Sequence, residues 1–539
     1  MLLAQSSTQA FEAILLSSVA AVLFFGIQSA VHASSDKTRA PSTSRILSLC
    51  LAPVALFKRR ARAWMFLING PEQIQEAYDK AKGKPFFVDV PENRYLVVSS
   101  WKHIKEIDAA PDSVLSLQGA AKEILQPKYT MSSFNWLDKR GAEGTPLIRT
   151  LRTMLTNHLP DVLPDIRRAM SGLLDGMYAS HPVINGVKTS QLYPMVIKSI
   201  SHSNALAFFG EDLVKNEKFM KAATLFIEQT LLIAEVLRLL PKSFSNPIGK
   251  FLSSRLNSSK IIFDTLHPIA AERIDEWAKA KLGYDVPERK DCIQWVMESA
   301  PKAKPWTAER IVYELIALWF GSVHITSTTV CFALHDLCLH PEYVEPLRKE
   351  IETAGWDKFD KSGGKCFPLL DSFMKESARL TPVESVSTRR MALQPFQLSD
   401  GPKIDVGQWV CTAARGMMND AAFFASPDEF HGFRFANPSL LASAAEKNLI
   451  PAGLVPELTN SAASAFTDIS DWQLWGTGKC ACPGRYYASA VMKIMLGLFL
   501  TKYDMQLTDR DASRHFAWRT FIYPYEGTTA ILTPREEAA

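Results

Sequence analysis

The sequence predicts a mainly helical protein with a small β-subdomain assembled from both ends of the chain. Between about residues 146 and 374, apolar residues recur with helical spacing, most clearly in TLFIEQTLLIAEVLRLL and in the long run from Trp306 to His340. Short runs rich in β-branched and aromatic residues lie before and after this stretch. A helical body with strands on both flanks is therefore the expected architecture.

The expected elements follow one another in a simple order. After Gly70, PEQIQEAYDKAKGK predicts a short amphipathic helix, and FFVDV and RYLVVSS predict two strands around PEN. The run 306–340 is apolar nearly all round in its middle, which predicts a buried helix. After Leu380, SVSTRR, FQLSDGPKIDV and QWVCTA predict further strands. Beyond Gly484, RYYASAVMKIMLGLFLTKY predicts a last helix before a strand-rich tail.

Composition limits the class of protein. The chain has 539 residues, of which 47% are hydrophobic and 22% charged, as in an ordered globular protein. A net charge of +4 is too small to indicate nucleic-acid binding by itself. Eight irregularly spaced cysteines do not form a disulfide framework, so free thiols facing the cytosol are the simpler interpretation.

The N-terminus predicts a membrane anchor. The run from Ala13 to Val31 is apolar and long enough to cross a bilayer, and Lys37, Arg39 and Arg45 follow it. Because the basic residues come after the run, the positive-inside rule places the N-terminus in the lumen and the rest of the chain in the cytosol. A cleaved signal peptide would have a basic segment before a shorter apolar core. We therefore expect an anchor at 1–33, a membrane-proximal linker at 34–69 and a catalytic domain at 70–539.

A second apolar segment follows the anchor. The stretch from Ile46 to Phe57 is too short to span a bilayer and contains Pro53, and a basic run at 58–62 comes directly after it. Such a pairing suits a segment that lies on an anionic membrane surface. An ordinary surface helix with a solvated basic end explains it equally well.

The stretch WGTGKCACPGRYYASA, from Trp475 to Ala490, places two cysteines inside a glycine-rich loop. Zinc would need a second Cys/His pair at matching spacing, and none is present in the sequence. A disulfide between the two cysteines would be reduced in the cytosol. A nucleophilic thiolate would need a base, which stays open at this point, and iron fits the surroundings better. Cys482 comes just before a predicted helix, where amide N–H groups and the helix dipole stabilise a thiolate.

The order Trp475, Gly478, Cys482, Gly484 resembles the aromatic-x-x-Gly-x-x-x-Cys-x-Gly signature of the cytochrome P450 family. The resemblance implies the cytochrome P450 fold, with Cys482 as the axial ligand of the iron of a thiolate-ligated haem b. It also implies that Trp475 and Gly478 contribute to the cofactor site. A register with Cys480 as the ligand would put Cys482 where the glycine belongs. Cys480 itself stands where many relatives carry a basic residue that contacts a haem propionate.

Further motifs follow the family order. Glu376 and Arg379 in FMKESARLTP resemble the Glu-x-x-Arg pair, and Arg434 in SPDEFHGFRF resembles the third member of that network. Two guanidinium groups around one carboxylate would form a charge-assisted structural lock. Taken alone, Glu376 and Arg379 would be an ordinary surface pair one helical turn apart. Arg152 and Arg389 match residues that contact the haem propionates in relatives, although either is nearly as well explained as a solvated arginine.

The middle of the long predicted helix departs from the family pattern. Gly321 and Ser322 resemble the point where the helix opens to accommodate dioxygen. In that register His324 replaces the acid, and Ile325 replaces the alcohol that is expected to deliver protons. The candidates for a proton relay are then Thr326 and His324. Alternatively, His324 is a buried core histidine whose ring donates a hydrogen bond to a backbone carbonyl.

The resemblance implies a monooxygenase that oxidises a hydrophobic small molecule, as the microsomal enzymes of fungal secondary metabolism do. Without the usual alcohol, desaturation or ring rearrangement is as plausible as hydroxylation. The loop 116–136, the region 225–240 and the long helix are expected to contact the substrate. The predicted pocket residues are Met131, Phe134, Phe320, Gly321 and Ile325.

The resemblance also implies partners and a location. Electrons would come from NADPH through a cytochrome P450 reductase, with cytochrome b5 as an additional donor, at the endoplasmic reticulum membrane. Lys479, Arg485 and Lys493 would form part of a basic docking face for the reductase, unless they are scattered solvated charges. Two alternatives remain: a haem-thiolate isomerase or dehydratase that needs no reductase, and a non-catalytic haem sensor or binding protein.

Overall fold

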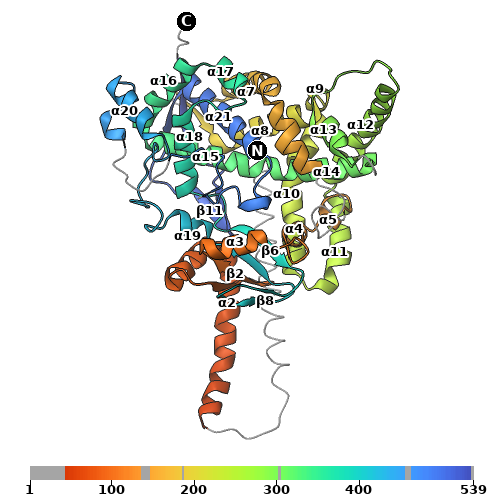
Figure 1. Ribbon diagram of the computed structural model, residues 1–539, viewed down its shortest axis with the longest axis vertical. Helices are drawn as coiled ribbons and strands as arrows, with labels where there is room; N and C mark the ends of the chain where they lie inside the picture. Colours follow the sequence, from red (N-terminus) through yellow and green to blue (C-terminus); the bar gives the residue numbers. More distant parts are fainter. Residues whose placement is uncertain are drawn as a thin grey trace. The chain divides into compact units, whose positions relative to one another are not determined.

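The computed structural model describes residues 43–134, 146–184, 187–301, 305–455, 463–470 and 472–535. The predicted anchor at 13–31 lies outside these residues. The chain divides into a unit at 1–61 and a compact unit at 62–539 (Figure 1). The compact unit begins before residue 70 because Ala63, Phe66 and Leu67 are already buried. Everything below concerns this second unit.

Helices make up most of the described chain, as the sequence predicts. Their bounds are α2 Thr43–Ala81, α3 Trp101–Ala109, α4 Leu117–Leu125, α5 Pro127–Thr130, α6 Pro146–Arg149, α7 Leu159–Ser180, α8 Leu192–Phe209, α9 Glu211–Val214, α10 Glu217–Leu239, α11 Lys242–Arg255, α12 Ser258–Lys281, α13 Cys292–Ser299, α14 Ala308–Ser322, α15 His324–Leu339, α16 Val344–Ala354, α17 Trp356–Lys361, α18 Pro368–Leu380, α19 Ala414–Met418, α20 Pro438–Glu446 and α21 Arg485–Lys502. Short turns of other helix types are η1 Thr150–Leu155 (π-helical), η2 Pro341–Tyr343, η3 Ala452–Leu454 and η4 Gly478–Cys480 (3-10). Inside α2, Asn69 has non-helical backbone angles and marks a kink.

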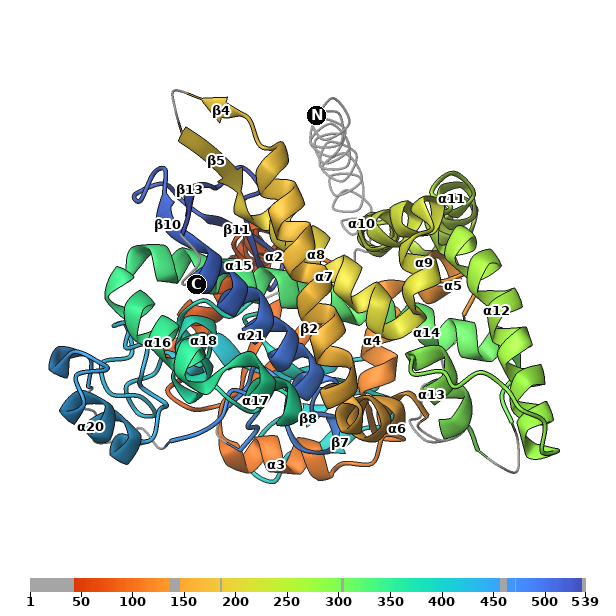
Figure 2. The same ribbon diagram turned by 90° about the horizontal axis from the view of Figure 1, so that it is seen from above.

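The centre of the helical body is α15. It packs against α8, α18 and α21, which surround it in Figures 1 and 2. Among the described residues, one stretch, Ala308–Leu339, is long and apolar enough to cross a membrane, and 67% of its most apolar window is buried inside the protein. Enclosure by other helices therefore explains why the sequence of this stretch is apolar on all sides.

Strands from both ends of the chain meet in one sheet, which confirms the predicted β-subdomain. The strands are β1 Phe86–Asp89, β2 Arg94–Val98, β3 Leu115–Ser116, β4 Val183–Ile184, β5 Val187–Gln191, β6 Ser387–Ala392, β7 Phe396–Gln397, β8 Lys403–Ile404, β9 Trp409–Thr412, β10 Tyr503–Leu507, β11 His515–Trp518, β12 Phe521–Pro524 and β13 Thr529–Pro534. The five-stranded sheet has the order β1-β2-β9-β6-β3, and β2 runs parallel to β9 with Tyr95 opposite Trp409.

The remaining strands form smaller sheets. A four-stranded sheet has the order β10-β13-β5-β4. Its strands β4 and β5 lie inside the stretch 146–374, which was predicted to be almost entirely helical, and β5 pairs with β13 near the C-terminus. The other two sheets of the described residues are the hairpins β7–β8 and β11–β12, and the first of them turns at Ser399, Asp400 and Gly401.

Candidate functional site

The cysteine loop is a tight turn that needs two glycines. Gly476 and Gly478 have φ angles of +73° and +56°, a region that side chains disfavour. A Cβ on Gly478 would also lie 2.7 Å from Cγ of Asp108, because α3 packs against η4. The backbone N–H of Cys482 donates to the carbonyl of Trp475 at 2.7 Å and closes the loop. The positions of the glycines are therefore fixed by backbone geometry and by the approach of α3.

The sulfur of Cys482 lies immediately before α21, as the sequence predicts. Burial raises the pKa of its thiol, while hydrogen bonds from the N–H groups of Gly484 and Arg485 and the charges of Arg485 and Arg152 act in the opposite direction. Arg152, in the π-helical turn η1, donates to the carbonyls of Ala481 at 3.1 Å and Lys479 at 3.3 Å. These contacts hold the loop against η1 and aim donors at the sulfur.

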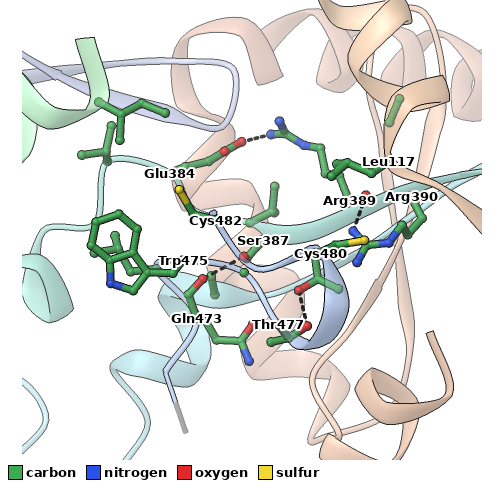
Figure 3. Close-up of a pocket in the computed structure, with 18 of the residues that line it drawn as sticks. Leu117, Glu384, Ser387, Arg389, Arg390, Gln473, Trp475, Thr477, Cys480 and Cys482 are labelled. Atoms are coloured by element: carbon green, nitrogen blue, oxygen red, sulfur yellow. Dashed lines mark hydrogen bonds and ion pairs between the residues drawn. The ribbon is translucent and has the colours of Figure 1, made fainter. Parts of the chain in front are cut away.

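A cavity of about 360 Å³ opens in front of this sulfur (Figure 3). The cysteine loop forms one wall through Trp475, Gly476, Thr477, Cys480 and Cys482. The other walls come from α4, α15, β6, α19 and nearby loops, and they are mostly apolar. Their lining residues include Leu117, Ala120, Ala121, Ile124, Ile325, Val383, Glu384, Val386, Arg389, Arg390 and Ala414.

The residues of this cavity fit a haem group bound through one thiolate. A cationic metal deprotonates a coordinating thiol, which would offset the burial of Cys482. Among the described residues, no group of three or more His, Cys, Asp or Glu side chains is arranged to hold a metal ion. Cys480 also lines the cavity, and neither Cys480 nor Cys482 forms a disulfide bond. The donor set therefore suits axial ligation better than a zinc site or a disulfide.

The structure brings Glu376, Arg379 and Arg434 together in the interior. The three side chains are fully buried. Arg379 donates to both carboxylate oxygens of Glu376 at 2.7 and 2.9 Å, and Nε of Arg434 lies 2.9 Å from each of them. Both guanidinium groups also donate to the carbonyl of Glu429. This cluster connects α18 to the segment before α20, and it excludes the alternative of an ordinary surface pair.

Two adjacent arginines of β6 line the cavity but have different partners. Arg389, the predicted propionate ligand, forms an ion pair with Glu384 and donates to Oγ1 of Thr520 at 2.7 Å. Nη2 of Arg390 lies 3.5 Å from Oδ1 of Asp108, which packs under the cysteine loop. The structure thus places Arg390, which the sequence analysis did not single out, on the cysteine-loop side.

The long predicted helix is broken at Val323, between α14 and α15, close to the predicted opening. The exposed carbonyl of Ser322 accepts a hydrogen bond from Nδ2 of Asn204 at 3.0 Å. Oδ1 of Asn204 in turn accepts from the hydroxyl of Tyr487 at 2.9 Å. These hydrogen bonds connect α8 and α21 to the break, and they stabilise the opening between α14 and α15.

The three residues after the break point in different directions. Ile325 lines the cavity, with 46% of its surface exposed, whereas Thr326 is buried and does not line it. Nδ1 of His324 lies 3.1 Å from the hydroxyl of Tyr193 on α8. Burial lowers the pKa of His324 to about 4, so the ring is neutral at pH 7. Neither of the two predicted relay residues reaches the cavity in this structure.

Most of the other predicted pocket residues lie away from this cavity. Met131 and Phe134 are buried, and Phe134 stacks on Tyr313 with ring centroids 4.8 Å apart. Phe320 packs edge-to-face on Phe226. Gly321 is exposed, with open space where a Cβ would be. Of the five predicted residues only Ile325 lines the cavity, while α4, within the predicted loop 116–136, supplies four apolar side chains.

Lys493 cannot belong to the predicted basic docking face, because its side chain is internal. Lys493 is 3% exposed, forms an ion pair with Asp371 at 2.5 Å and donates to the carbonyl of Cys366. Arg485 donates to the carbonyls of Thr467 and Cys482. The place of Lys493 in a predicted helix did not reveal that its side chain is enclosed inside the protein.

Comparisons with known proteins agree with this geometry. A model of the cytochrome P450 family matches residues 143–526. Cytochrome P450 monooxygenase 151 of Postia placenta is 28% identical over 530 residues, which cover 96% of this chain and 97% of the relative. Cytochrome P450 monooxygenase olcJ of Penicillium canescens is 26% identical and covers 87% of this chain and 85% of the relative.

A third relative and one solved structure extend the comparison. Ent-kaurene oxidase P450-4 of Gibberella fujikuroi is 29% identical over 58% of this chain and 59% of the relative. The structure of retinoic acid bound cyanobacterial CYP120A1 superimposes with a TM-score of 0.61 over 85% of this chain and 94% of that chain, at 16% identity, which supports the fold alone. Since the family model matches most of the chain, this protein belongs to the cytochrome P450 family and is an oxidoreductase of the monooxygenase type.

Proposed function

We propose that this protein is a haem-thiolate monooxygenase that oxidises a hydrophobic small molecule in fungal secondary metabolism, with Cys482 as the axial ligand. The observation that carries the proposal is the Cys482 sulfur at the wall of an interior cavity, with two backbone N–H groups directed at it. Fungal relatives that include an ent-kaurene oxidase support the class of reaction. The apolar walls of the cavity support an apolar substrate.

The residues of the chain have distinct tasks in this proposal. When bound, the haem would supply activation of dioxygen and insertion of one oxygen atom into the substrate. Cys482 would hold it through its thiolate, and Trp475, in the same loop, donates from Nε1–H to the carbonyl of Phe466 at 2.6 Å. Arg390 lines the cavity beside the cysteine loop and Arg152 donates to two carbonyls of that loop, and we infer that these two arginines neutralise the propionates.

The cavity side of α15 bears on the type of reaction. A hydrocarbon side chain cannot relay a proton, and Ile325 is the α15 residue that lines the cavity. Protons would then come from ordered water or from a hydroxyl of the substrate. This favours desaturation or ring rearrangement beside hydroxylation as the outcome.

Electron supply and location complete the proposal. Electrons would come from NADPH through a cytochrome P450 reductase, with cytochrome b5 as a second donor. The segment at 13–31 would anchor the chain in the endoplasmic reticulum membrane, with the catalytic domain in the cytosol.

The carbon monoxide difference spectrum of the reduced, full-length protein in microsomes tests the proposal. We expect a strongly red-shifted Soret band that is lost in Cys482→Ala and kept in the matched control Cys480→Ala. Absence of this band from folded, haem-containing wild type would refute thiolate ligation by this loop. Turnover without NADPH and reductase would instead indicate an isomerase or dehydratase, and a bound ligand that is never converted would indicate a sensor.

A further inference from the structure

Arg389 stands at one end of the cavity as a charged group among apolar walls. We propose that Arg389, oriented by Glu384 and Thr520, is a specificity-determining residue that binds an oxygen acceptor, a carboxylate or carbonyl, on an otherwise apolar substrate. This inference rests on the proposed monooxygenase function and replaces the expectation that Arg389 binds a haem propionate.

The first step is the different surroundings of the two neighbouring arginines. Arg389 and Arg390 are successive residues of β6, whose register against β9 is irregular between Ser387 and Arg390, and the two side chains have different partners. Arg390 faces Asp108, which packs against Gly478 of the cysteine loop. Arg389 faces Glu384 instead, and Figure 3 shows its guanidinium directed to that carboxylate. If one of the two serves the haem propionates, the geometry favours Arg390.

The second step is a smaller hollow on the other side of Arg389. This hollow of about 20 Å³ is lined by Phe66, Tyr95, Ile124, Arg238, Arg389, Arg519, Thr520 and Phe521. Arg389 and Ile124 line both this hollow and the main cavity, and no residue of the cysteine loop lines the hollow. Arg389 therefore forms part of the wall between the two spaces, where a substrate extending away from the cysteine would meet it.

The third step is the state of the guanidinium group. Nη2 donates to Thr520, whose hydroxyl donates to Oε1 of Glu384 at 2.9 Å, so the group is held in one orientation. The buried Nε of Arg389 has no hydrogen-bond partner among the described residues. A buried donor without an acceptor is unfavourable, and a ligand oxygen would satisfy it.

The other charges near the hollow are already paired. Arg519 donates to Glu235 at 2.9 Å and to Glu92 at 2.8 and 3.0 Å, and Arg238 forms an ion pair with Glu92. Nε of Arg238 is also buried without a hydrogen-bond partner among the described residues, but of the three arginines that line the hollow only Arg389 also lines the main cavity. Around Arg389 lie the apolar side chains of α4 and of the loop before β6. A molecule that is apolar except for one oxygen acceptor matches this end of the cavity.

Azole probes test the inference, because their imidazole binds haem iron and places a tail of known length in the cavity. The experiment measures spectral dissociation constants of the haem-loaded full-length protein for 1-alkylimidazoles and for ω-(imidazol-1-yl)alkanoic acids and their methyl esters, across a series of chain lengths. At one length we expect the acid, the ester or both to bind at least about tenfold more tightly than the alkyl probe, the scale of one added charge-assisted hydrogen bond. Arg389→Gln should abolish this preference, and a preference restricted to the acid would identify a carboxylate.

Haem content distinguishes the two arginines. Arg389→Gln should retain its haem, whereas the matched variant Arg390→Gln should lose part of it. If Arg389→Gln loses haem and Arg390→Gln does not, Arg389 is a propionate ligand and the inference is wrong. It is also wrong if no chain length shows a preference for an oxygen-bearing tail, or if that preference survives in Arg389→Gln. A wild type without the thiolate band would instead refute the proposed function, so the two failures are distinguishable.

Discussion

The cysteine side and the helix-break side of the cavity are built differently. On the cysteine side, a Cβ at Gly478 would clash with Asp108, Trp475 and Arg152 each donate to a backbone carbonyl, and the buried cluster around Glu376 connects α18 to the segment before α20. On the helix-break side, the side chain of Asn204 holds the carbonyl of Ser322, while Ile325 faces the cavity without any polar contact. Polar and ionic contacts therefore surround the cysteine side, whereas on the helix-break side the polar contacts lie behind the cavity wall and the residue that lines the cavity is apolar.

The largest effect should come from the cysteine side, at Glu376. Glu376→Gln leaves the buried guanidinium groups of Arg379 and Arg434 without their shared counter-charge, and breaking a buried pair in this way typically costs about 3–5 kcal/mol. Urea unfolding of the wild type and of Glu376→Gln measures this loss of stability. Asp264→Asn is the matched control, because its partner Lys260 is 72% exposed and such pairs contribute about 1 kcal/mol or less. Equal losses in the two variants would contradict a special role for the cluster.

Gly478 should show the next largest effect. Gly478→Ala imposes a positive φ on a side chain and a contact with Asp108, and together these should cost about 2–4 kcal/mol. Gly172→Ala on α7 is the control, since nothing lies within 4 Å of its Cβ and a helical alanine should stabilise by about 0.5–1 kcal/mol. Thermal unfolding measures both variants. Partial rescue of Gly478→Ala by Asp108→Ala is expected, and its absence would show that the backbone angle alone causes the loss.

On the helix-break side, Asn204 should have a smaller effect. Asn204→Ala leaves the carbonyl of Ser322 and the hydroxyl of Tyr487 without their partner, which should cost about 1–3 kcal/mol. Tyr487→Phe removes only one of the two contacts and should cost less. Urea unfolding of both variants checks this order. A Tyr487→Phe variant that is less stable than Asn204→Ala would mean that the carbonyl contact does not support the break.

The smallest effect on stability should come from Ile325. Ile325→Thr changes a side chain that faces open space, so the free energy of unfolding should change by no more than about 1 kcal/mol. The share of consumed NADPH that appears as product should nevertheless rise, because a hydroxyl at this point of the cavity can pass a proton. Thr326→Val, at a buried position outside the cavity, is the control and should leave this share unchanged. If the share of consumed NADPH that appears as product is unchanged in Ile325→Thr, residue 325 has no role in proton delivery.

Much of the site was predictable because short motifs specify local geometry. The cysteine loop, the Glu-x-x-Arg pair and Arg434 are each recognisable within about ten residues of sequence, and the structure brings them where the family resemblance implies. The strands β4 and β5 were missed because they are short and are formed only by pairing with β13, far away in the chain. Arg390 was missed because the choice between two adjacent arginines depends on the irregular register of β6 against β9 and on the position of Asp108, and neither is visible in the sequence.

The sequence by itself determined the family, the helical body with strands at both ends, the position of the glycine-rich cysteine loop and the interruption of the long helix. These follow from periodicity, from glycine positions and from a motif, all of which are local in the chain. Only the tertiary structure decided which side chains face the cavity: it placed Ile325 there, turned His324 to Tyr193, enclosed Lys493 and separated Arg389 from Arg390. Such orientations depend on contacts between α4, α8, α15, β6 and α21, and residues far apart in sequence meet only when the chain has folded.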